Sequence, residues 1–275
     1  MMPAPSIREQ QEITDFLDRE TAKIDALIEK KEQLIELLQE ERMALITHAV
    51  TKGLDPNVTM KDSGAKWLGI IPMSWQVVPL NQCLSTYTYG FTNPMPVAEQ
   101  GPYMLTALDI GDGNLLYENA RHTTIEAYEG LLTDKSRPRE GDILLTKDGT
   151  LGRVAVADGS QVCINQSIAL LRFNPSLIDT GFIQYLLRSA IYQNRMILEA
   201  GGTAIKHIYI SRLAKMPIGL PSLTEQRHIA RHINSFAAKI SILTARVAEA
   251  VAFLREYRTA LILAAVRGKI DVRNA

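Results

Sequence analysis

Hydrophobic positions recur with a helical period in two long segments of the chain, residues 5–50 and 221–266. In the second segment the spacing is that of heptads, typical of a helix that packs one apolar stripe against another helix. Its apolar positions are Ile229, Ile233, Phe236, Ile240, Leu243, Val247, Ala250, Leu254, Tyr257, Leu261 and Ala264. The first segment repeats the frame at Ile13, Leu17, Ile24, Leu27, Leu34, Leu38 and Leu45, interrupted by Glu20, Lys31 and Glu41. Each segment is therefore predicted to be one long helix.

The two segments are copies of one sequence. A constant offset of 216 residues aligns 5–50 with 221–266 without a gap, and 17 of the 46 aligned positions are identical. Both copies begin Pro-Ser-x-x-Glu-Gln. This is the spacing of a capping box, in which the oxygen of Ser6 or Ser222 accepts a backbone amide and the glutamate reaches back. We therefore expect two helices of similar sequence with one domain of unrelated sequence between them.

A helix of this length must find a partner of similar length. At about 1.5 Å per residue it is about 69 Å long, too long to bury its stripe against one small domain. Because the domain between them joins the end of the first helix to the start of the second, the chain can fold the two as an antiparallel coiled coil. The residues expected at the helix-pairing interface are Leu17, Ile24, Leu27, Leu34, Leu38, Ile233, Ile240, Leu243, Val247 and Leu254.

The sequence between the helices predicts a mixed α+β domain. Residues 53–75 are rich in Gly, Pro, Asp and Asn and are expected to form a linker between the first helix, 5–52, and the domain, 76–220. The second helix is placed at 221–270. Short apolar runs between turn signals indicate strands, followed by one or two helices. The strands are expected at 76–80, 142–146, 153–157 and 167–173, and the helices from 181 to 198.

Composition and charge narrow the class of protein. Of 275 residues 46% are hydrophobic and 22% charged, which is ordinary for a soluble globular protein. Without an apolar run of about 18 residues or a signal peptide, the chain is expected in the cytoplasm. Cys83 and Cys163 lack the paired spacing of a zinc or redox site and are expected to be buried thiols.

The zero net charge conceals an asymmetry between the two helices. Six basic and eleven acidic residues give 5–50 a charge of −5, whereas nine basic and four acidic residues give 221–275 a charge of +5. Residues 51–220 hold fifteen basic and fifteen acidic residues. The opposite charges favour pairing of one repeat with the other over self-pairing.

Small and hydrogen-bonding residues gather in three segments of the predicted domain, which makes them candidates for binding a polar ligand. Lys147 and Thr150 lie in 146–152, which alone is typical of a hairpin. Adjacent glycines in 200–207 let backbone amides approach a phosphate, although such a segment is also typical of a flexible connector. The carboxamides of Asn165 and Gln166 could contact adenine edges or close a turn. The candidates are Lys147, Thr150, Asn165, Gln166, Gly202, Thr203 and Lys206, and aromatic stacking, if these side chains are not core, would come from Tyr87, Tyr89, Phe91, Tyr103 and Tyr117.

The sequence offers little sign of catalysis. It has no phosphate-binding glycine loop ending in Gly-Lys-Ser/Thr, no His-Glu-x-x-His and no Gly-x-Ser-x-Gly. Glu140, Asp142 and Lys147 have the residue types of a metal-dependent nuclease. Asp142 and Lys147, however, are five residues apart on one predicted strand and so face opposite sides. We therefore assign no catalytic and no metal-binding residue.

Several segments, in order along the chain, carry a resemblance to a known family. They are Pro5 and Pro221–Gln226 at the helix starts, Lys61–Pro72 with Trp75, Gly141–Gly152, and Asn165–Ser167. Together these segments resemble the specificity subunit of type I restriction-modification systems, over nearly the whole chain.

The resemblance implies a subunit without catalysis or a cofactor of its own. It makes the candidates for DNA contact Lys147, Thr150, Asn165, Gln166, Gly202, Thr203 and Lys206. In that family two recognition domains at opposite ends of two antiparallel helices each read half of an interrupted double-stranded DNA sequence, and the helices set the gap. Modification subunits, which carry S-adenosylmethionine and methylate adenine, bind around the helices, and restriction subunits, which use ATP and magnesium, cut the DNA. The alternatives are a stand-alone metal-dependent nuclease and a coiled-coil adaptor that binds protein.

This sequence departs from the family in length. It begins a few residues before the first helix, so we expect one recognition domain where the family has two. A half-length subunit could form a homodimer that presents two domains, could be completed by another chain, or could be an inactive truncation.

Overall fold

A computed structural model describes residues 6–202 and 206–272, which divide into two compact units. The helical unit holds the described residues of Met1–Arg42 and Ser235–Ala275, and the globular unit is Met43–Asn234. The helices α1 (Ile7–Lys52) and α6 (Leu223–Val266) contain 46 and 44 residues, so both predicted long helices are confirmed.

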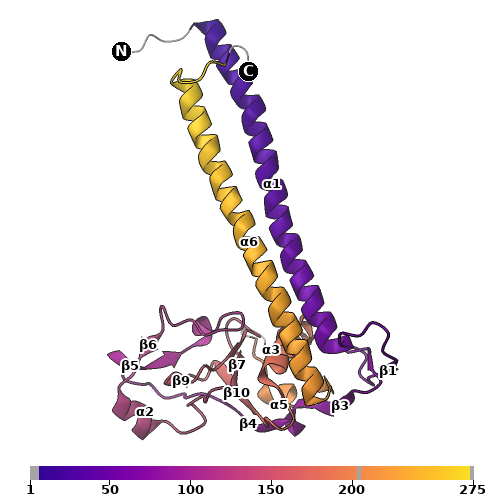
Figure 1. The fold of residues 1–275 in the computed structure, drawn as a ribbon. Helices are drawn as coiled ribbons and strands as arrows, with labels where there is room; N and C mark the ends of the chain where they lie inside the picture. The colour runs from indigo at the N-terminus through magenta and orange to yellow at the C-terminus, as the bar shows by residue number, and fades with distance from the viewer. Residues whose placement is uncertain (1–5, 203–205, 273–275) are drawn as a thin grey trace. The chain divides into compact units, whose positions relative to one another are not determined.

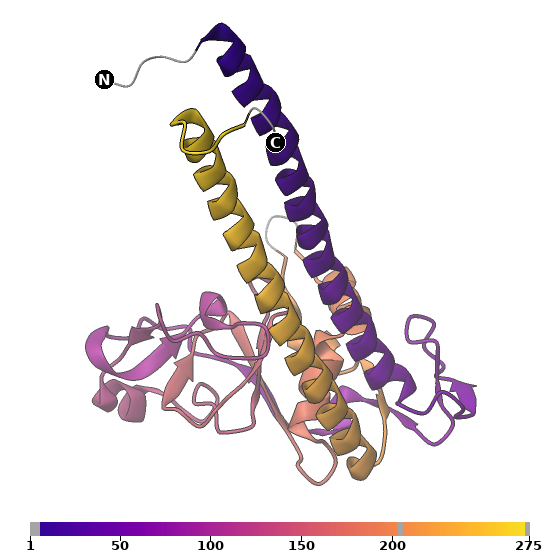
Figure 2. The same cartoon turned by 45° about the horizontal axis from the view of Figure 1, so that its top comes forward.

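In the helical unit α1 and α6 lie side by side, in indigo and yellow, in both views (Figure 1, Figure 2). Two ion pairs join them: Arg255 Nη2 lies 2.7 Å from Glu32 Oε1, and Arg258 Nη2 lies 3.1 Å from Asp25 Oδ2. Because the number rises on one helix as it falls on the other, the paired segments run antiparallel. Both pairs join an acid of the first repeat to an arginine of the second, in agreement with their opposite charges.

Burial along the two helices shows where the apolar stripe runs. From Thr21 to Arg42, every third or fourth residue of α1 is buried or half-buried and all others are exposed. The same positions, 216 residues later, are buried or half-buried on α6. The stripe on α1 is Thr21, Ile24, Ile28, Lys31, Ile35, Leu38 and Arg42, and that on α6 is Ala237, Ile240, Thr244, Val247, Val251, Leu254 and Arg258. The two repeats therefore use one heptad frame.

Three of the ten residues expected at the helix-pairing interface lie off this stripe, and the other seven are buried or half-buried. Leu27, Leu34 and Leu243 were expected at the helix-pairing interface, yet they are 44%, 40% and 43% exposed. The stripe instead passes one residue later, for example at Ile28 and at Ile35. Adjacent apolar residues such as Leu34-Ile35 fit both an i+3 and an i+4 step, so periodicity alone did not separate the two frames.

The globular unit is mixed α and β. A four-stranded antiparallel sheet has the order β4 (Leu84–Tyr89), β10 (Ile168–Phe173), β7 (Ile143–Thr146), β8 (Val154–Val156). A three-stranded sheet has the order β6 (Arg121–His122), β5 (Ala98–Leu105), β9 (Val162–Ile164), with β5 and β9 parallel. Two further two-stranded antiparallel sheets pair β1 (Met60–Asp62) with β2 (Ile70–Pro72) and β3 (Gln76–Pro79) with β11 (Pro217–Leu220). The helices of this unit are α2 (Ile125–Leu131), α3 (Thr180–Arg188), α4 (Ala190–Glu199) and α5 (Ile210–Leu213), with 3-10 turns η1 (Leu80–Gln82) and η2 (Ala107–Asp109).

The expected strands and helices of this unit are confirmed within one or two residues, as β3, β7, β8, β10, α3 and α4. Strands β1, β2, β4, β5, β6, β9 and β11 were not expected. Segment 53–75 is more than a linker, because Leu68, Ile71 and Trp75 are almost fully buried in the main core. Among the described residues, no helix is long and apolar enough to cross a membrane.

Candidate functional site

The start of α6 is joined to the globular core by the side chains of its opening motif. Ser222 Oγ accepts from Glu225 N at 3.3 Å, so the expected serine cap is present. The Glu225 carboxylate bonds to Trp75 Nε1, 2.9 Å away. Gln226 is fully buried, and its carboxamide accepts from Asp179 N at 2.8 Å and donates to Leu177 O at 2.9 Å. The motif therefore fixes the first turn of α6 within the globular unit.

The loop after β7 holds a charged cluster. Lys147 Nζ lies 2.5 Å from Asp148 Oδ2 and 5.4 Å from the centre of the Tyr89 ring. His207 Nδ1 lies 2.5 Å from the other oxygen, Asp148 Oδ1. Burial disfavours ionisation of Asp148, but the hydrogen bonds and charges of Lys147 and His207 outweigh it and lower the pKa of this carboxyl below its ordinary value. Asp148 therefore links the side chains of Lys147 and His207, which come from different segments of the chain.

Segment 146–152 forms the expected hairpin between β7 and β8. Gly152 N donates to Thr146 O at 2.8 Å, and Arg153 N donates to Thr146 Oγ1 at 2.9 Å. Gly149 has a φ of 75°, where glycine is favoured, and the neighbouring Thr150 side chain is exposed. The hairpin is thus closed by hydrogen bonds at Thr146, and Thr150 is exposed to solvent.

Backbone hydrogen bonds bring the candidate segments together. Lys147 N donates to Ser167 O at 2.8 Å, which places the Asn165–Gln166 turn beside the hairpin. Ile208 N donates to Lys147 O at 2.9 Å, which places the 206–208 segment on its other side. We call the result the three-loop surface, formed by 147–150, 165–166 and 206–207. Gln166 and Lys206 are exposed on it.

Of the seven residues expected to contact DNA, the structure brings five into this surface: Lys147, Thr150, Asn165, Gln166 and Lys206. Gly202 precedes it in the same loop, where Gly201 and His207 form a bridge. Thr203 lies outside the described residues.

Sequence reasoning missed two residues within this surface, Asp148 and His207, and two that follow it in the chain, Tyr209 and Arg212. Tyr209 is 44% exposed, and the Arg212 guanidinium lies 4.9 Å from its ring centre. Asp148 and His207 are 59 residues apart, so spacing along the chain gave no sign of their contact. Of the aromatic candidates, Tyr87 and Tyr89 are 42% and 47% exposed.

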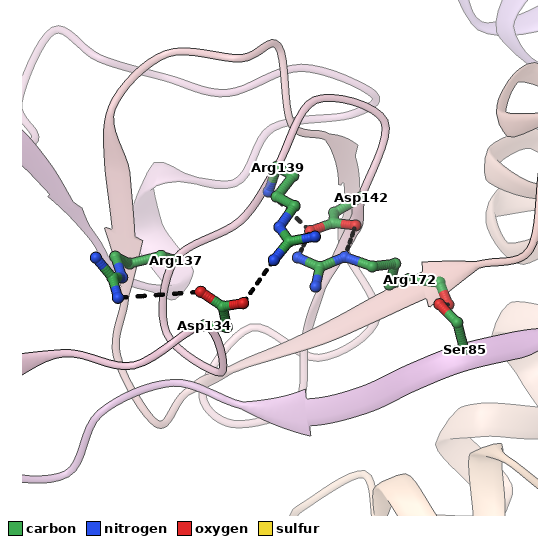
Figure 3. Close-up of polar contacts among 6 residues, drawn as sticks. All are labelled: Ser85, Asp134, Arg137, Arg139, Asp142 and Arg172. Carbon is green, nitrogen blue, oxygen red and sulfur yellow. Dashed lines mark hydrogen bonds and ion pairs between the residues drawn. The ribbon is translucent and has the colours of Figure 1, made fainter.

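The residues of the nuclease alternative do not form a common site. Arg172 Nε and Nη2 donate to the two oxygens of Asp142 at 2.8 and 2.6 Å, and Arg139 N adds a third bond at 2.8 Å (Figure 3). Asp142 is 3% exposed and Arg172 is half-buried, so the carboxylate is held inside the domain by a structural ion pair. Lys147 lies at the other end of β7, about 16 Å away at about 3.3 Å per residue.

The structure also describes the two cysteine thiols and the side chains that could bind a metal ion. Cys83 and Cys163 are both buried and free, as expected. Burial raises the pKa of Cys83 and raises that of Cys163 to about 12, which suppresses the reactive thiolate. Among the described residues, no group of three or more His, Cys, Asp and Glu side chains could hold a metal ion.

Comparison with known proteins identifies the relatives of this chain. Residues 99–251 match the family model described as the type I restriction modification DNA specificity domain. The chain is 26% identical over 282 residues to the type I restriction enzyme EcoBI specificity subunit of Escherichia coli, covering 99% of this chain and 59% of that one. It is 23% identical to the type I restriction enzyme MjaVIII specificity subunit of Methanocaldococcus jannaschii, covering 99% and 63%.

A solved structure shares the fold. The HsdS subunit from Thermoanaerobacter tengcongensis superposes with a TM-score of 0.59 at 19% identity, covering 97% of this chain and 60% of that one. The chain therefore spans about three fifths of the length of the relatives it matches.

Proposed function

Because the chain belongs to the family of type I restriction modification DNA specificity domains, we propose that it recognises a DNA sequence on behalf of partner subunits. In this proposal the chain directs adenine methylation and DNA cleavage but performs neither. S-adenosylmethionine, ATP and magnesium would be held by the modification and restriction subunits.

The three-loop surface is the observation that carries this proposal. Three segments far apart in sequence place lysines, a hydroxyl and carboxamides side by side. Lys147 and Lys206 have the charge to contact phosphates and set the register on the duplex. The exposed Gln166 and Thr150 have the donors and acceptors that distinguish base edges in the major groove.

The neutral charge of residues 51–220 limits the affinity that the isolated chain can have for DNA. Fifteen basic residues face fifteen acidic ones, and Asp148 neutralises part of the charge of Lys147. Affinity for DNA depends mainly on how many phosphates are neutralised. We infer that the isolated chain binds DNA weakly and that modification subunits supply most of the electrostatic attraction.

We further propose that α1 and α6 form an antiparallel coiled coil that acts as a spacer. The support is the alternating three- and four-residue step of buried positions and the two ion pairs of the helical unit. The flanking exposed apolar residues would receive modification subunits. They include Leu27, Leu37, Ile242, Phe253 and Tyr257.

The repeat also supports a second recognition position. Glu225, Gln226 and Ile229 contact or pack into the globular unit, and their counterparts in the first repeat, Glu9, Gln10 and Ile13, are identical. We propose that the first repeat receives a second recognition domain, supplied in a homodimer by another copy of the chain. A mass of twice 30.6 kDa in light scattering supports this, whereas a stable monomer in the presence of modification subunit assigns the second domain to another chain.

The function is tested by selecting DNA from a random pool with the complex of this chain and its modification subunit. Enrichment of one interrupted sequence supports recognition, and no enrichment favours a protein-binding adaptor. The purified chain is also incubated with plasmid and magnesium. Steady cleavage without partner subunits contradicts the proposal and restores the nuclease alternative.

A further inference from the structure

A cavity of about 560 Å³ opens in the globular unit beside the three-loop surface. Apolar side chains of β5 and of the segment before it, Met104 and Phe91 among them, form most of its wall. Five polar residues interrupt that wall: Thr106, Asp109, Asn119, Arg121 and Asn165. An apolar cavity with a few fixed polar groups is the usual form of a small-molecule site.

Asn165 lines the cavity and keeps a hydrogen-bond donor available. Its Oδ1 accepts from Ser167 N at 3.1 Å and from Ser167 Oγ at 2.5 Å. A backbone amide can only donate, so the atom that faces Ser167 N must be the oxygen. The amide nitrogen Nδ2 is therefore the half of the side chain left to bind, and within the described part of the chain it has no bonded partner.

Asp109 lines the same cavity as an acceptor. Its Oδ2 accepts from Thr106 N at 2.7 Å and from Thr106 Oγ1 at 2.8 Å, which fixes the carboxylate on the first turn of η2. The residue is only 7% exposed, yet these bonds engage one oxygen and leave Oδ1 with acceptor capacity.

The donor and the acceptor are held on one rigid frame. Ala107 N donates to Ser167 Oγ at 3.0 Å, and Asn165 N donates to Leu105 O at 3.1 Å. The frame also excludes side chains at Gly90, where a Cβ would lie 1.8 Å from Ile164 O. These two hydrogen bonds join the segment that carries Asp109 to the segment that carries Asn165.

From this geometry we propose that the cavity binds one nucleotide. A nucleobase is a flat heterocycle whose pairing edge offers a donor beside an acceptor, which complements Asp109 and Asn165. The exposed Arg121 lines the cavity and provides a cation for the phosphate. This inference goes beyond recognition of base edges in a DNA groove. A base can enter the cavity only from a free nucleotide or after it has left a duplex.

The test is calorimetric titration of the purified full chain with the four deoxynucleoside monophosphates and with the four nucleosides. We expect saturable binding at one site, with the preferred monophosphate tighter than its nucleoside. Arg121→Ala should weaken the monophosphate about tenfold and leave the nucleoside unchanged, as expected for loss of a charged hydrogen bond. Arg139→Ala, which removes an exposed arginine outside the cavity, is the matched control and should change neither.

A second variant tests the base contacts. Asn165→Asp keeps the oxygen that Ser167 needs but replaces the donor with an acceptor beside Asp109, so nucleotide and nucleoside should both weaken tenfold or more, with an unchanged thermal melt. Competition by a duplex with one unpaired base assigns the base to DNA, and lack of competition assigns it to a free nucleotide. The proposal is overturned if none of the four nucleotides binds saturably, or if Arg121→Ala weakens nucleoside and nucleotide equally.

Discussion

The indole nitrogen of Trp75 donates to the carboxylate of Glu225 across 150 residues of sequence, at 2.9 Å. Trp75 is fully buried, and it lies at the end of the segment that precedes β3. This bond therefore ties segment 53–75 to the first turn of α6 inside the globular unit.

Trp75→Phe should destabilise the globular unit by about 1–3 kcal/mol, because it removes the donor and leaves the Glu225 carboxylate without this partner. Urea unfolding followed by circular dichroism measures the change. The matched Glu225→Gln keeps an oxygen acceptor and should cost less. Equal stability of Trp75→Phe and the wild type would show that the bond is not significant.

The pair of buried Asp142 and half-buried Arg172 should be structural. Asp142→Asn should lower the free energy of unfolding by about 1.5–3 kcal/mol, because it removes the charge from the carboxylate to which the Arg172 guanidinium donates. Asp134→Asn is the control, since the side chains of its ion pair with Arg139 are 66% and 63% exposed, and it should change stability by less than about 1 kcal/mol. A stable Asp142→Asn protein that has lost a magnesium-dependent cleavage activity contradicts the structural role.

Substitutions at two neighbouring residues of α1 test which heptad frame faces the other helix. Ile35 is half-buried in the stripe, whereas Leu34 is 40% exposed. Ile35→Ala should cost about 1–2 kcal/mol and Leu34→Ala within about 0.5 kcal/mol, as measured by thermal unfolding. The reverse order would restore the frame that includes Leu27 and Leu34.

The Asp148 cluster should make stability depend on pH. The lowered pKa of Asp148 in the folded state means that its ionised form favours folding. This contribution is present above its ordinary value of 3.8 and is lost as pH falls through the lower folded-state pKa. Asp148→Asn should therefore be less stable than the wild type at pH 6, and the difference should shrink near pH 3. A difference independent of pH contradicts this account.

Phosphate contact by Lys147 predicts a change in salt dependence. In the complex with modification subunits, Lys147→Ala should weaken binding to all DNA sequences alike and reduce the slope of log affinity against log salt by about 1. Gln166→Ala should instead change the preferred base at one position. Lys66→Ala, an exposed lysine outside the three-loop surface, should do neither.

The long helices, four strands and two helices of the globular unit could be predicted because each follows from a local apolar pattern. Strands β5 and β9 could not, since their parallel pairing joins residues about 60 apart. The candidate residues of the three-loop surface could be proposed from the sequence only in part. Lys147, Asn165 and Lys206 carry visible chemistry, but their assembly depends on Asp148, His207 and backbone bonds that sequence spacing does not encode.

The central claim is that this chain selects the DNA sequence that partner subunits modify. It is tested most directly by co-expressing the chain with its modification subunit in a host without adenine methylation and sequencing the methylated adenines. The account predicts methylation at one interrupted sequence, shifted by Gln166→Ala and unchanged by Lys66→Ala. Methylation at no defined sequence, or at the same sequence without the chain, contradicts it.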